Sequence, residues 1–316
     1  YAPPHPPAQN NTRRNRAQTR QPLLSHRQMS HFSLVTKGKL VEFSRPVVMG
    51  ILNATPDSFY SASRLASELE VAHAAERMVL EGAGMLDLGA YSSRPGAADV
   101  PPEEELKRLE TAVKAVRKAV GDDIPLSIDT FRSLVALKAV GEWGADIVND
   151  ISGGEADSGM FAAVAELRCP YVLMHMRGTP ATMQTMTDYG DVTSEVVAWL
   201  SHRLRQLEEL AVADIVVDPG FGFAKTTEQN YRMLAELRQF ELLGRPLLAG
   251  MSRKSMITKV LGCDSGSGAA LAATTALNVL ALERGASILR VHDVEAASAA
   301  VEMFVKMENA LHSEHT

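Results

Sequence analysis

The sequence predicts a (β/α)8 barrel in one domain, an α/β fold of parallel strands that alternate with helices. Short apolar runs rich in β-branched residues recur along the chain, and longer segments with helical periodicity separate them. The runs are continuously apolar rather than alternating, as expected for a parallel sheet that is covered on both faces. The chain has 316 residues, and about 250 are enough for such a barrel.

The strands are predicted in order from the apolar runs. Each run is short, and nearly every one passes directly into a polar or charged residue. The predicted strands span residues 47–52, 85–88, 125–128, 146–148, 171–174, 215–217, 246–249 and 288–291.

Helices are predicted between the strands because apolar residues recur at spacings of three and four. The clearest span residues 67–83, 103–120, 132–145 and 193–211, and several end at a glycine. Residues 268–286 are rich in Ala and Thr and predict a buried helix, since a membrane span needs about 20 more hydrophobic residues. An open doubly wound sheet is the alternative fold, but no Gly-x-Gly-x-x-Gly turn follows the first strand.

Composition argues against two classes of partner. The formal net charge of −6 gives no overall attraction to nucleic acid or to an anionic membrane, so we expect neither as a partner. Cys169 and Cys263 have no metal-binding or redox spacing, and we expect both to be reduced thiols in the cytoplasm.

The N-terminal segment differs from the rest of the chain. It is rich in arginine, it has four prolines among its first seven residues, and the first acidic residue is Glu42. It can be a disordered basic tail, an organelle-targeting peptide, or an extension that precedes a start at Met29. No amphipathic period is evident, so we expect a tail or extension over residues 1–36 and a catalytic domain over residues 37–312.

Polar side chains follow nearly every predicted strand. A barrel carries its functional residues at the carboxyl ends of its strands. One Asp or Asn there is ordinarily a loop cap, but a succession around the barrel predicts a polar ring at one mouth. His175 can line this mouth or cap its strand. The ring consists of Asn53, Asp87, Asp129, Asn149, Asp150, His175, Asp218, Ser252, Lys254, Arg290 and His292.

One part of the ring suits a flat heterocycle. Asp129, Asn149, Asp218 and Lys254 together supply carboxylate acceptors, an amide and an ammonium. A carboxylate accepts hydrogen bonds from a guanidine-like edge, and the ammonium can donate to a carbonyl. This set therefore indicates a ligand with several N–H donors and a carbonyl.

The other part suits a polyanion with a metal ion. Asn53, Ser93, Arg94, Arg290 and His292 are rich in donors and suit a diphosphate. The amide oxygen of Asn53 can also ligate magnesium, which often takes one or two protein oxygens and receives its other ligands from phosphate and water. We therefore expect Mg²⁺ as the cofactor.

The chain resembles the dihydropteroate synthase family. The resemblance covers the chain from about residue 37 to about residue 305 and rests on motifs that occur in the family's order, each at a predicted strand end. The motifs are MGILNATPDSF (49–59), GAGMLDLGAYSSRPGA (82–97), SIDT (127–130), IVNDISGG (147–154), LMHMRGTP (173–180), VVDPGFGFAKT (216–226), GMSRKS (250–255) and RVHDV (290–294).

The resemblance implies a transferase of folate biosynthesis. Members of the family join 6-hydroxymethyl-7,8-dihydropterin diphosphate to 4-aminobenzoate and release diphosphate and 7,8-dihydropteroate. They are commonly homodimers, which we expect here. The chain is also a candidate sulfonamide target, because these drugs mimic 4-aminobenzoate.

The resemblance also implies roles by position. Asp129, Lys254, Arg290 and His292 are expected to take part in catalysis. The expected ligand contacts are Asp129, Asn149, Asp218 and Lys254 for the pterin, Arg290 and His292 for the diphosphate, Asn53 for magnesium, and Ser93, Arg94, Phe223 and Ser255 for 4-aminobenzoate and the loops around it.

Two loops depart from the family's pattern. Ser61 replaces the acidic residue that is usual in the first loop, and Tyr91 replaces the glutamate that is usual in the second. We expect Tyr60 and Tyr91 to keep the two loops in contact. Two alternative functions stay open: a catalytically silent pterin-binding homologue, which only Ser61 favours, and a pterin-dependent methyltransferase, which would need no diphosphate clamp.

Overall fold

A computed structural model describes residues 1, 31–54, 64–91 and 100–312, and it confirms the (β/α)8 barrel. Eight parallel strands form one sheet in the order β8-β7-β6-β5-β4-β3-β10-β9. The strands are β3 (Val47–Asn53), β4 (Met85–Gly89), β5 (Leu126–Asp129), β6 (Ile147–Asp150), β7 (Tyr171–Met174), β8 (Ile215–Asp218), β9 (Leu248–Ala249) and β10 (Ile288–Val291).

The two strands at the ends of that order also meet. Val217 in β8 forms a parallel bridge with Leu247, immediately before β9. The backbone N–H of Val217 donates to the carbonyl of Pro246 at 2.9 Å. The sheet therefore closes on itself, which removes its open edges.

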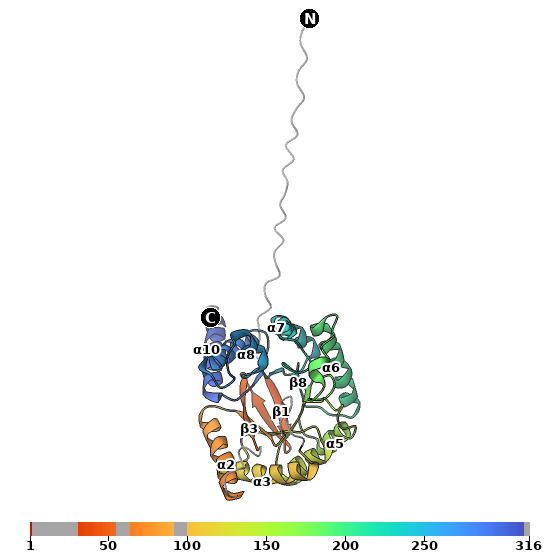
Figure 1. The fold of residues 1–316 in the computed structure, drawn as a ribbon, viewed down its shortest axis with the longest axis vertical. Helices are drawn as coiled ribbons and strands as arrows, with labels where there is room; N and C mark the ends of the chain where they lie inside the picture. Colours follow the sequence, from red (N-terminus) through yellow and green to blue (C-terminus); the bar gives the residue numbers. More distant parts are fainter. Residues whose placement is uncertain (2–30, 55–63, 92–99, 313–316) are drawn as a thin grey trace.

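The helices surround the sheet as an outer layer (Figure 1). The helix predicted over residues 132–145 is α4 followed by a π-helical turn over Ala139–Trp143, which ends at Gly144 with a φ of 95°. No helix among the described residues is long and apolar enough to cross a membrane. The helices are α2 (Arg64–Leu80), α3 (Pro102–Val120), α4 (Ser133–Lys138), α5 (Met160–Leu167), α6 (Val192–Glu209), α7 (Thr227–Ala235), α8 (Ser255–Leu261), α9 (Gly268–Leu282) and α10 (Val294–His312).

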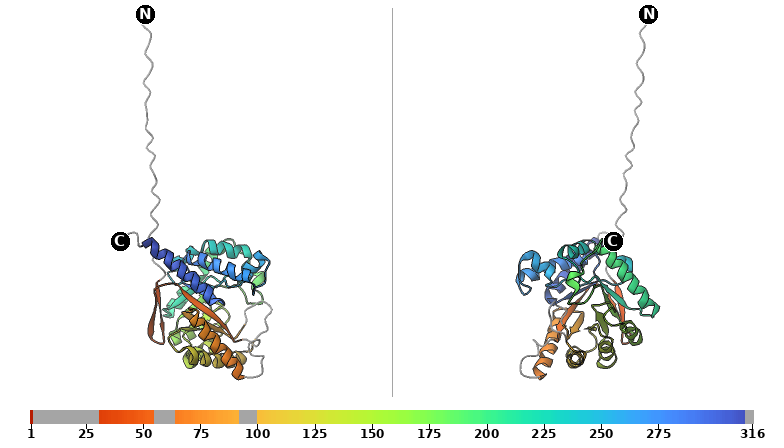
Figure 2. Two further views of the ribbon diagram at one scale, coloured as in Figure 1. Left: turned by 90° about the vertical axis from the view of Figure 1, so that its left-hand side faces the viewer. Right: turned by 45° about the vertical axis from the view of Figure 1, so that its right-hand side comes forward.

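A hairpin precedes the barrel and lies at one end of it (Figure 2). Its strands, β1 (Phe32–Thr36) and β2 (Lys39–Phe43), pair antiparallel through a turn at Lys37 and Gly38, whose φ angles are 49° and 74°. The expected boundary at residue 36 is therefore wrong for residues 32–36. Phe32 and Leu34 alternate with exposed residues and pack into the barrel, and this burial makes the segment a strand. Residues 2–30 lie outside the described part of the chain.

The interior of the barrel changes from apolar to polar along its axis. Side chains that point inward are two residues apart along a strand. A buried cluster fills the end nearest the hairpin and includes Met85, Ile147, Val172, Val216, Leu248 and Ile288. Two residues further along the same strands are Asp87, Asn149, Met174, Asp218, Gly250 and Arg290. The alternation of the strands alone therefore places polar side chains inside the carboxyl mouth.

Candidate active site

A hydrogen-bonded network around Arg290 and Asp87 joins four strands at this mouth. Its Nε donates to Oδ2 of Asp87 at 2.6 Å, and its Nη2 donates to Oδ2 of Asp129 at 2.7 Å. Nδ2 of Asn149 donates to the same oxygen of Asp87 at 2.9 Å. The structure thus brings together three residues that the sequence predicted, Asp129, Asn149 and Arg290, and it connects the expected pterin group with the expected diphosphate group.

Asp87 is the functional candidate to which the sequence analysis gave no role. It lies within β4 rather than after it, and its exposed fraction is 0%. One of its carboxylate oxygens, Oδ1, is buried without a hydrogen-bond partner among the described residues. A charged residue inside an otherwise apolar strand was the available signal, because a buried carboxylate requires a charged or hydrogen-bonding partner.

Lys254 and Asp218 form a second charged group beside the first. Nζ of Lys254 donates to the carbonyl of Phe221 at 2.6 Å and lies 4.6 Å from the centre of the Phe223 ring. Oδ1 of Asp218 accepts from the N–H of Gly220 at 2.7 Å. A Cβ at Gly250 would lie 3.8 Å from Nζ of Lys254 and 3.9 Å from Oδ2 of Asp218, so the glycine leaves open space between the two charges.

Burial shifts the pKa values of three residues at this mouth, Asp129, Asp218 and Lys254, toward neutral pH. It raises the pKa of Asp129 to about 7, although the guanidinium of Arg290 opposes the shift. It also raises the pKa of Asp218, against the opposing charge of Lys254. Burial lowers the pKa of the Lys254 ammonium to about 8. Perturbed groups that share a mouth are typical of a functional site.

An apolar wall adjoins the charged groups. It is a separate cluster at the barrel mouth, and Phe223 links it to Lys254. Polarizable methionine side chains suit the face of a flat ring. Of the residues in this wall, only Phe223 was expected at the site from the sequence. The cluster comprises Ile151, Met174, Met176, Met183, Phe223 and Ala224, with Phe131 packed against it.

His292 is tied to the loop that carries Lys254. The backbone N–H of His292 donates to Oγ of Ser252 at 3.1 Å, and its Nδ1 lies 3.0 Å from the same oxygen. Arg253 donates through Nε and Nη2 to the two carboxylate oxygens of Asp293, each at 2.7 Å. The loops after β9 and β10 are therefore locked together, and His292 and Lys254 are held by one unit.

The remaining predicted contacts are placed less centrally or fall outside the described residues. Asn53 ends β3 with an exposed side chain, and Ser255 is exposed at the start of α8. Tyr91 packs edge-on against Phe131, with ring centres 5.1 Å apart. Ser93, Arg94, Tyr60 and Ser61 lie outside the described part of the chain, and the expected contact between the two tyrosines lies there with them.

Two residues of the predicted polar ring, His175 and Asp150, are buried and bond or pack against neighbouring protein groups. His175 is 1% exposed, its ring packs edge-on against Trp199, and burial lowers its pKa to about 2. Asp150 accepts hydrogen bonds from the N–H and hydroxyl of Ser152 and, at 2.8 Å, from the hydroxyl of Tyr171. Both residues organise their loops rather than face the open mouth.

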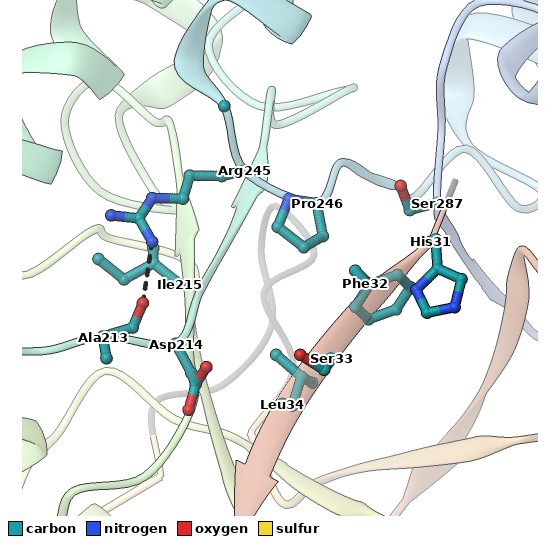
Figure 3. A pocket seen from close by; sticks show the side chains of 11 residues that line it. His31, Phe32, Ser33, Leu34, Ala213, Asp214, Ile215, Arg245, Pro246 and Ser287 are labelled. Atoms are coloured by element: carbon teal, nitrogen blue, oxygen red, sulfur yellow. Dashed lines mark hydrogen bonds between the residues drawn. The ribbon is translucent and has the colours of Figure 1, made fainter. Parts of the chain in front are cut away.

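A cavity of about 340 Å³ lies at the opposite end of the barrel (Figure 3). β1 forms one side of it, with Phe32 and Leu34, and residues that precede strands form the other. Asp214 precedes β8 and Ser287 precedes β10. This end of a barrel ordinarily serves stability, and the chemistry lies at the carboxyl mouth.

The loop after β8 gives a prediction about stability. Gly220 has a φ of 72°, and a Cβ there would lie 2.0 Å from the carbonyl oxygen of His175. Gly220→Ala is therefore expected to lower the free energy of unfolding by at least about 3 kcal/mol, since backbone strain and a clash add. Gly262→Ala is the control. Its φ is 59° with nothing within 4 Å of the added Cβ, so we expect a loss of about 1 kcal/mol. Equal losses in urea unfolding would contradict this account.

Comparisons with known proteins agree with this geometry. Residues 49–292 match the model of a family described as pterin binding enzyme. The chain is 44% identical over 254 residues to a dihydropteroate synthase of Synechocystis sp., covering 80% of this chain and 86% of that protein.

Solved structures are similar as well. The dihydropteroate synthase of Xanthomonas albilineans with 4-aminobenzoic acid superposes with a TM-score of 0.79 at 38% identity, covering 87% of this chain and 98% of that chain. The structure of the same enzyme with 7,8-dihydropteroate gives a TM-score of 0.76 at 35% identity, with the same coverage of 87% and 98%.

Proposed function

The chain belongs to the dihydropteroate synthase family of pterin binding enzymes, and from that premise we propose which of its residues carry the reaction. It is a transferase that joins 6-hydroxymethyl-7,8-dihydropterin diphosphate to 4-aminobenzoate, giving 7,8-dihydropteroate and diphosphate. One observation carries this assignment of residues: the residues expected to bind the pterin and those expected to bind the diphosphate lie together at one mouth of the barrel. Asp129, Asn149 and Asp218 supply acceptors beside Lys254, and Arg290 adjoins them.

The pterin binds among Asp129, Asn149, Asp218 and Lys254 in this proposal. Its N–H groups donate to the carboxylates of Asp129 and Asp218, and the Lys254 ammonium donates to a ring acceptor. Burial removes water from these groups and shifts the pKa values of Asp129 and Lys254 toward neutral pH. A bound pterin supplies the hydrogen bonds that water would otherwise make. The methionine-rich wall next to Phe223 packs on the ring face.

The reaction needs positioning and charge stabilisation more than a covalent protein nucleophile. The amine of 4-aminobenzoate attacks the exocyclic methylene of the pterin, a C–N bond forms, and the C–O bond to diphosphate breaks with its electron pair. The amine loses one proton to water. Arg290 and His292 stabilise the charge on the leaving diphosphate. Ser93, Arg94, Phe223 and Ser255 surround the aminobenzoate in this proposal.

The site suits a magnesium ion that takes only one ligand from the protein. No group of three or more His, Cys, Asp or Glu side chains in the described ranges could hold a metal by itself. Asn53 supplies one neutral oxygen at the mouth, and this suits an ion that keeps water and phosphate as its other ligands. When bound, magnesium supplies positive charge to the diphosphate.

This ligand set predicts that magnesium binding depends on diphosphate. Calorimetry should detect no Mg²⁺ binding to the protein alone at up to about 1 mM. With diphosphate present it should detect binding beyond that of a protein-free solution of Mg²⁺ and diphosphate. Asn53→Ala should weaken that binding by about tenfold, whereas Asn309→Ala, at an exposed position of α10, should not. Tight binding of Mg²⁺ without diphosphate would contradict the proposed site.

A cytoplasmic homodimer is the proposed working state. Both cysteines are unpaired, which suits a reducing compartment. Exposed apolar side chains on three successive helices suit a second copy of the chain, and light scattering of the purified protein tests the proposal by its mass. These side chains are Val260 and Leu261 on α8, Leu280 on α9, and Met303, Met307 and Leu311 on α10.

The function is tested by following both products. Purified protein with the pterin diphosphate and magnesium should release diphosphate and form dihydropteroate in equal amounts, and only when 4-aminobenzoate is added. Binding of the pterin with no aminobenzoate-dependent product would instead favour the catalytically silent homologue.

A further inference from the structure

Lys225 is a buried lysine without a role in the proposed reaction. Burial lowers its pKa to about 7, and the nearby carboxylate of Asp218 opposes this shift. Its exposed fraction is 4%. Its Nζ lies 3.0 Å from each of three acceptors, the carbonyl oxygens of Gly220 and Phe223 and Nδ1 of His175. In its ammonium form Lys225 has three N–H donors, and these three contacts use all of them and leave none for a substrate.

The third acceptor anchors the ammonium to the neighbouring strand. His175 follows β7 directly, it is buried, and its pKa is lowered to about 2 by burial and then by the charge of Lys225. The ring is therefore neutral at physiological pH, and Nδ1 can accept from Lys225. Trp199 packs edge-on against the ring at 5.1 Å between centres. Lys225 thus ties the loop after β8 to a fixed point immediately after β7.

The loop that Lys225 holds has an unfavourable backbone. Gly220 and Gly222 have φ angles of 72° and 83°, and Ala224, which has a side chain, has a φ of 49°. A left-handed alanine costs about 1 kcal/mol, so contacts elsewhere must maintain this shape. The carbonyls of Gly220 and Phe223 point at Lys225, which bonds both of them.

The same loop supports Lys254 over three consecutive residues. The carbonyl of Phe221 accepts from Nζ of Lys254 at 2.6 Å, and the Phe223 ring lies 4.6 Å from that nitrogen. A Cβ at Gly222 would lie 3.1 Å from Cδ of Lys254. The carbonyls that Lys225 binds belong to the residues immediately before and after this Phe221–Gly222 pair.

We propose that Lys225 is a positioning residue for pterin binding: it fixes the loop of residues 219–226, and this loop in turn fixes the ammonium of Lys254. The inference rests on the proposed role of Lys254 in binding the pterin. Lys225 acts from behind the loop and does not touch the substrate.

A double-mutant cycle tests the proposal. Lys225→Met, Lys254→Met and the double variant are compared for binding of the pterin diphosphate with magnesium, without 4-aminobenzoate, by calorimetry. Lys225→Met should weaken binding by about 10- to 100-fold, and Lys254→Met by at least as much. The double variant should bind no more than about threefold more weakly than Lys254→Met, because the loop then has no ammonium to position.

The outcomes separate this inference from the proposed function. Additive losses of binding, or a loss with Lys254→Met but none with Lys225→Met, overturn the role of Lys225 and leave the pterin site standing. Unchanged binding by Lys254→Met overturns the assigned pterin site and the inference with it. If Lys225→Met does not fold, Lys225→Gln replaces it in the same cycle, since its amide keeps two donors.

Arg117 provides the matched control for a general loss of stability. It donates from Nε to the carbonyl of Gly144 and from Nη1 to that of Ile124, each at 2.8 Å, and it pairs with the buried Asp146 before β6. Arg117→Met removes a partly buried cation at the other end of the barrel. It should lower the melting temperature and leave the pterin dissociation constant unchanged.

Discussion

Replacing Arg290 by methionine is expected to abolish most of the activity and to destabilise the protein. Arg290 donates to the carboxylates of both Asp87 and Asp129. The change therefore leaves the buried carboxylate of Asp87 without its cation and removes the partner that the two carboxylates share. Breaking a buried ion pair from one side costs about 3 to 5 kcal/mol of unfolding free energy. In the proposed complex Arg290 also donates to the leaving diphosphate, and loss of such a donor lowers kcat by about 10²- to 10³-fold. Steady-state kinetics and urea unfolding measure the two effects.

Two further variants separate the structural part from the catalytic part. Asp87→Asn in the Arg290→Met background should recover stability, because it neutralises the unpaired charge, but it should not recover activity. Arg245→Met removes a more exposed ion pair with Glu208 near the hairpin and should change neither quantity strongly. Activity of Arg290→Met within about threefold of the parent would show that Arg290 does not act on the leaving group.

Replacing Asp218 by asparagine is expected to abolish pterin recognition without harming the fold. The carboxylate accepts from N–H donors of the ring in the proposed complex, whereas the asparagine amide presents donors to donors. Two lost charged hydrogen bonds reduce kcat/KM for the pterin diphosphate by about 10²- to 10⁴-fold. Asp214→Asn is the matched control and should keep normal kinetics. Asp214 immediately precedes the same strand and accepts from the N–H of Val35 at 3.1 Å.

Asp218→Asn should lower activity without lowering the free energy of unfolding. Burial raises the pKa of Asp218 in the folded protein, so the folded state binds more protons than the unfolded state as pH rises above the ordinary Asp value. The carboxylate then contributes less stability as pH rises. Asp218→Asn lacks this loss and should be at least as stable as the parent at pH 7. A variant that lost stability and activity together would point to a structural role instead.

The alternation of the strands explains why the sequence alone could predict that these polar side chains lie at one mouth of the barrel. Asn149, Asp218 and Arg290 each lie two residues beyond an apolar residue that faces the barrel interior. A parallel barrel has only one carboxyl mouth, so strand assignment alone brings these residues together. The strand boundaries predicted at residues 171–174 and 288–291 agree with β7 and β10.

The features that sequence missed depend on contacts between distant segments. Asp87 was counted as a strand end, and its role depends on Arg290, which lies 203 residues away in the chain. The roles of Lys225 and His175 depend on a loop with left-handed residues that no hydrophobic period predicts. The residues of β1 were assigned to the N-terminal tail because their alternation of apolar and polar side chains is short. The alternation can be interpreted only when the end of the barrel that Phe32 and Leu34 cover is known.

The most direct test of the account is a crystal structure of the protein with the pterin diphosphate and magnesium, in the absence of 4-aminobenzoate. We expect the pterin ring to lie against Asp129, Asn149, Asp218 and Lys254, with the diphosphate toward Arg290 and His292. A pterin bound elsewhere, for instance in the cavity beside β1, or a diphosphate directed away from Arg290, would contradict it.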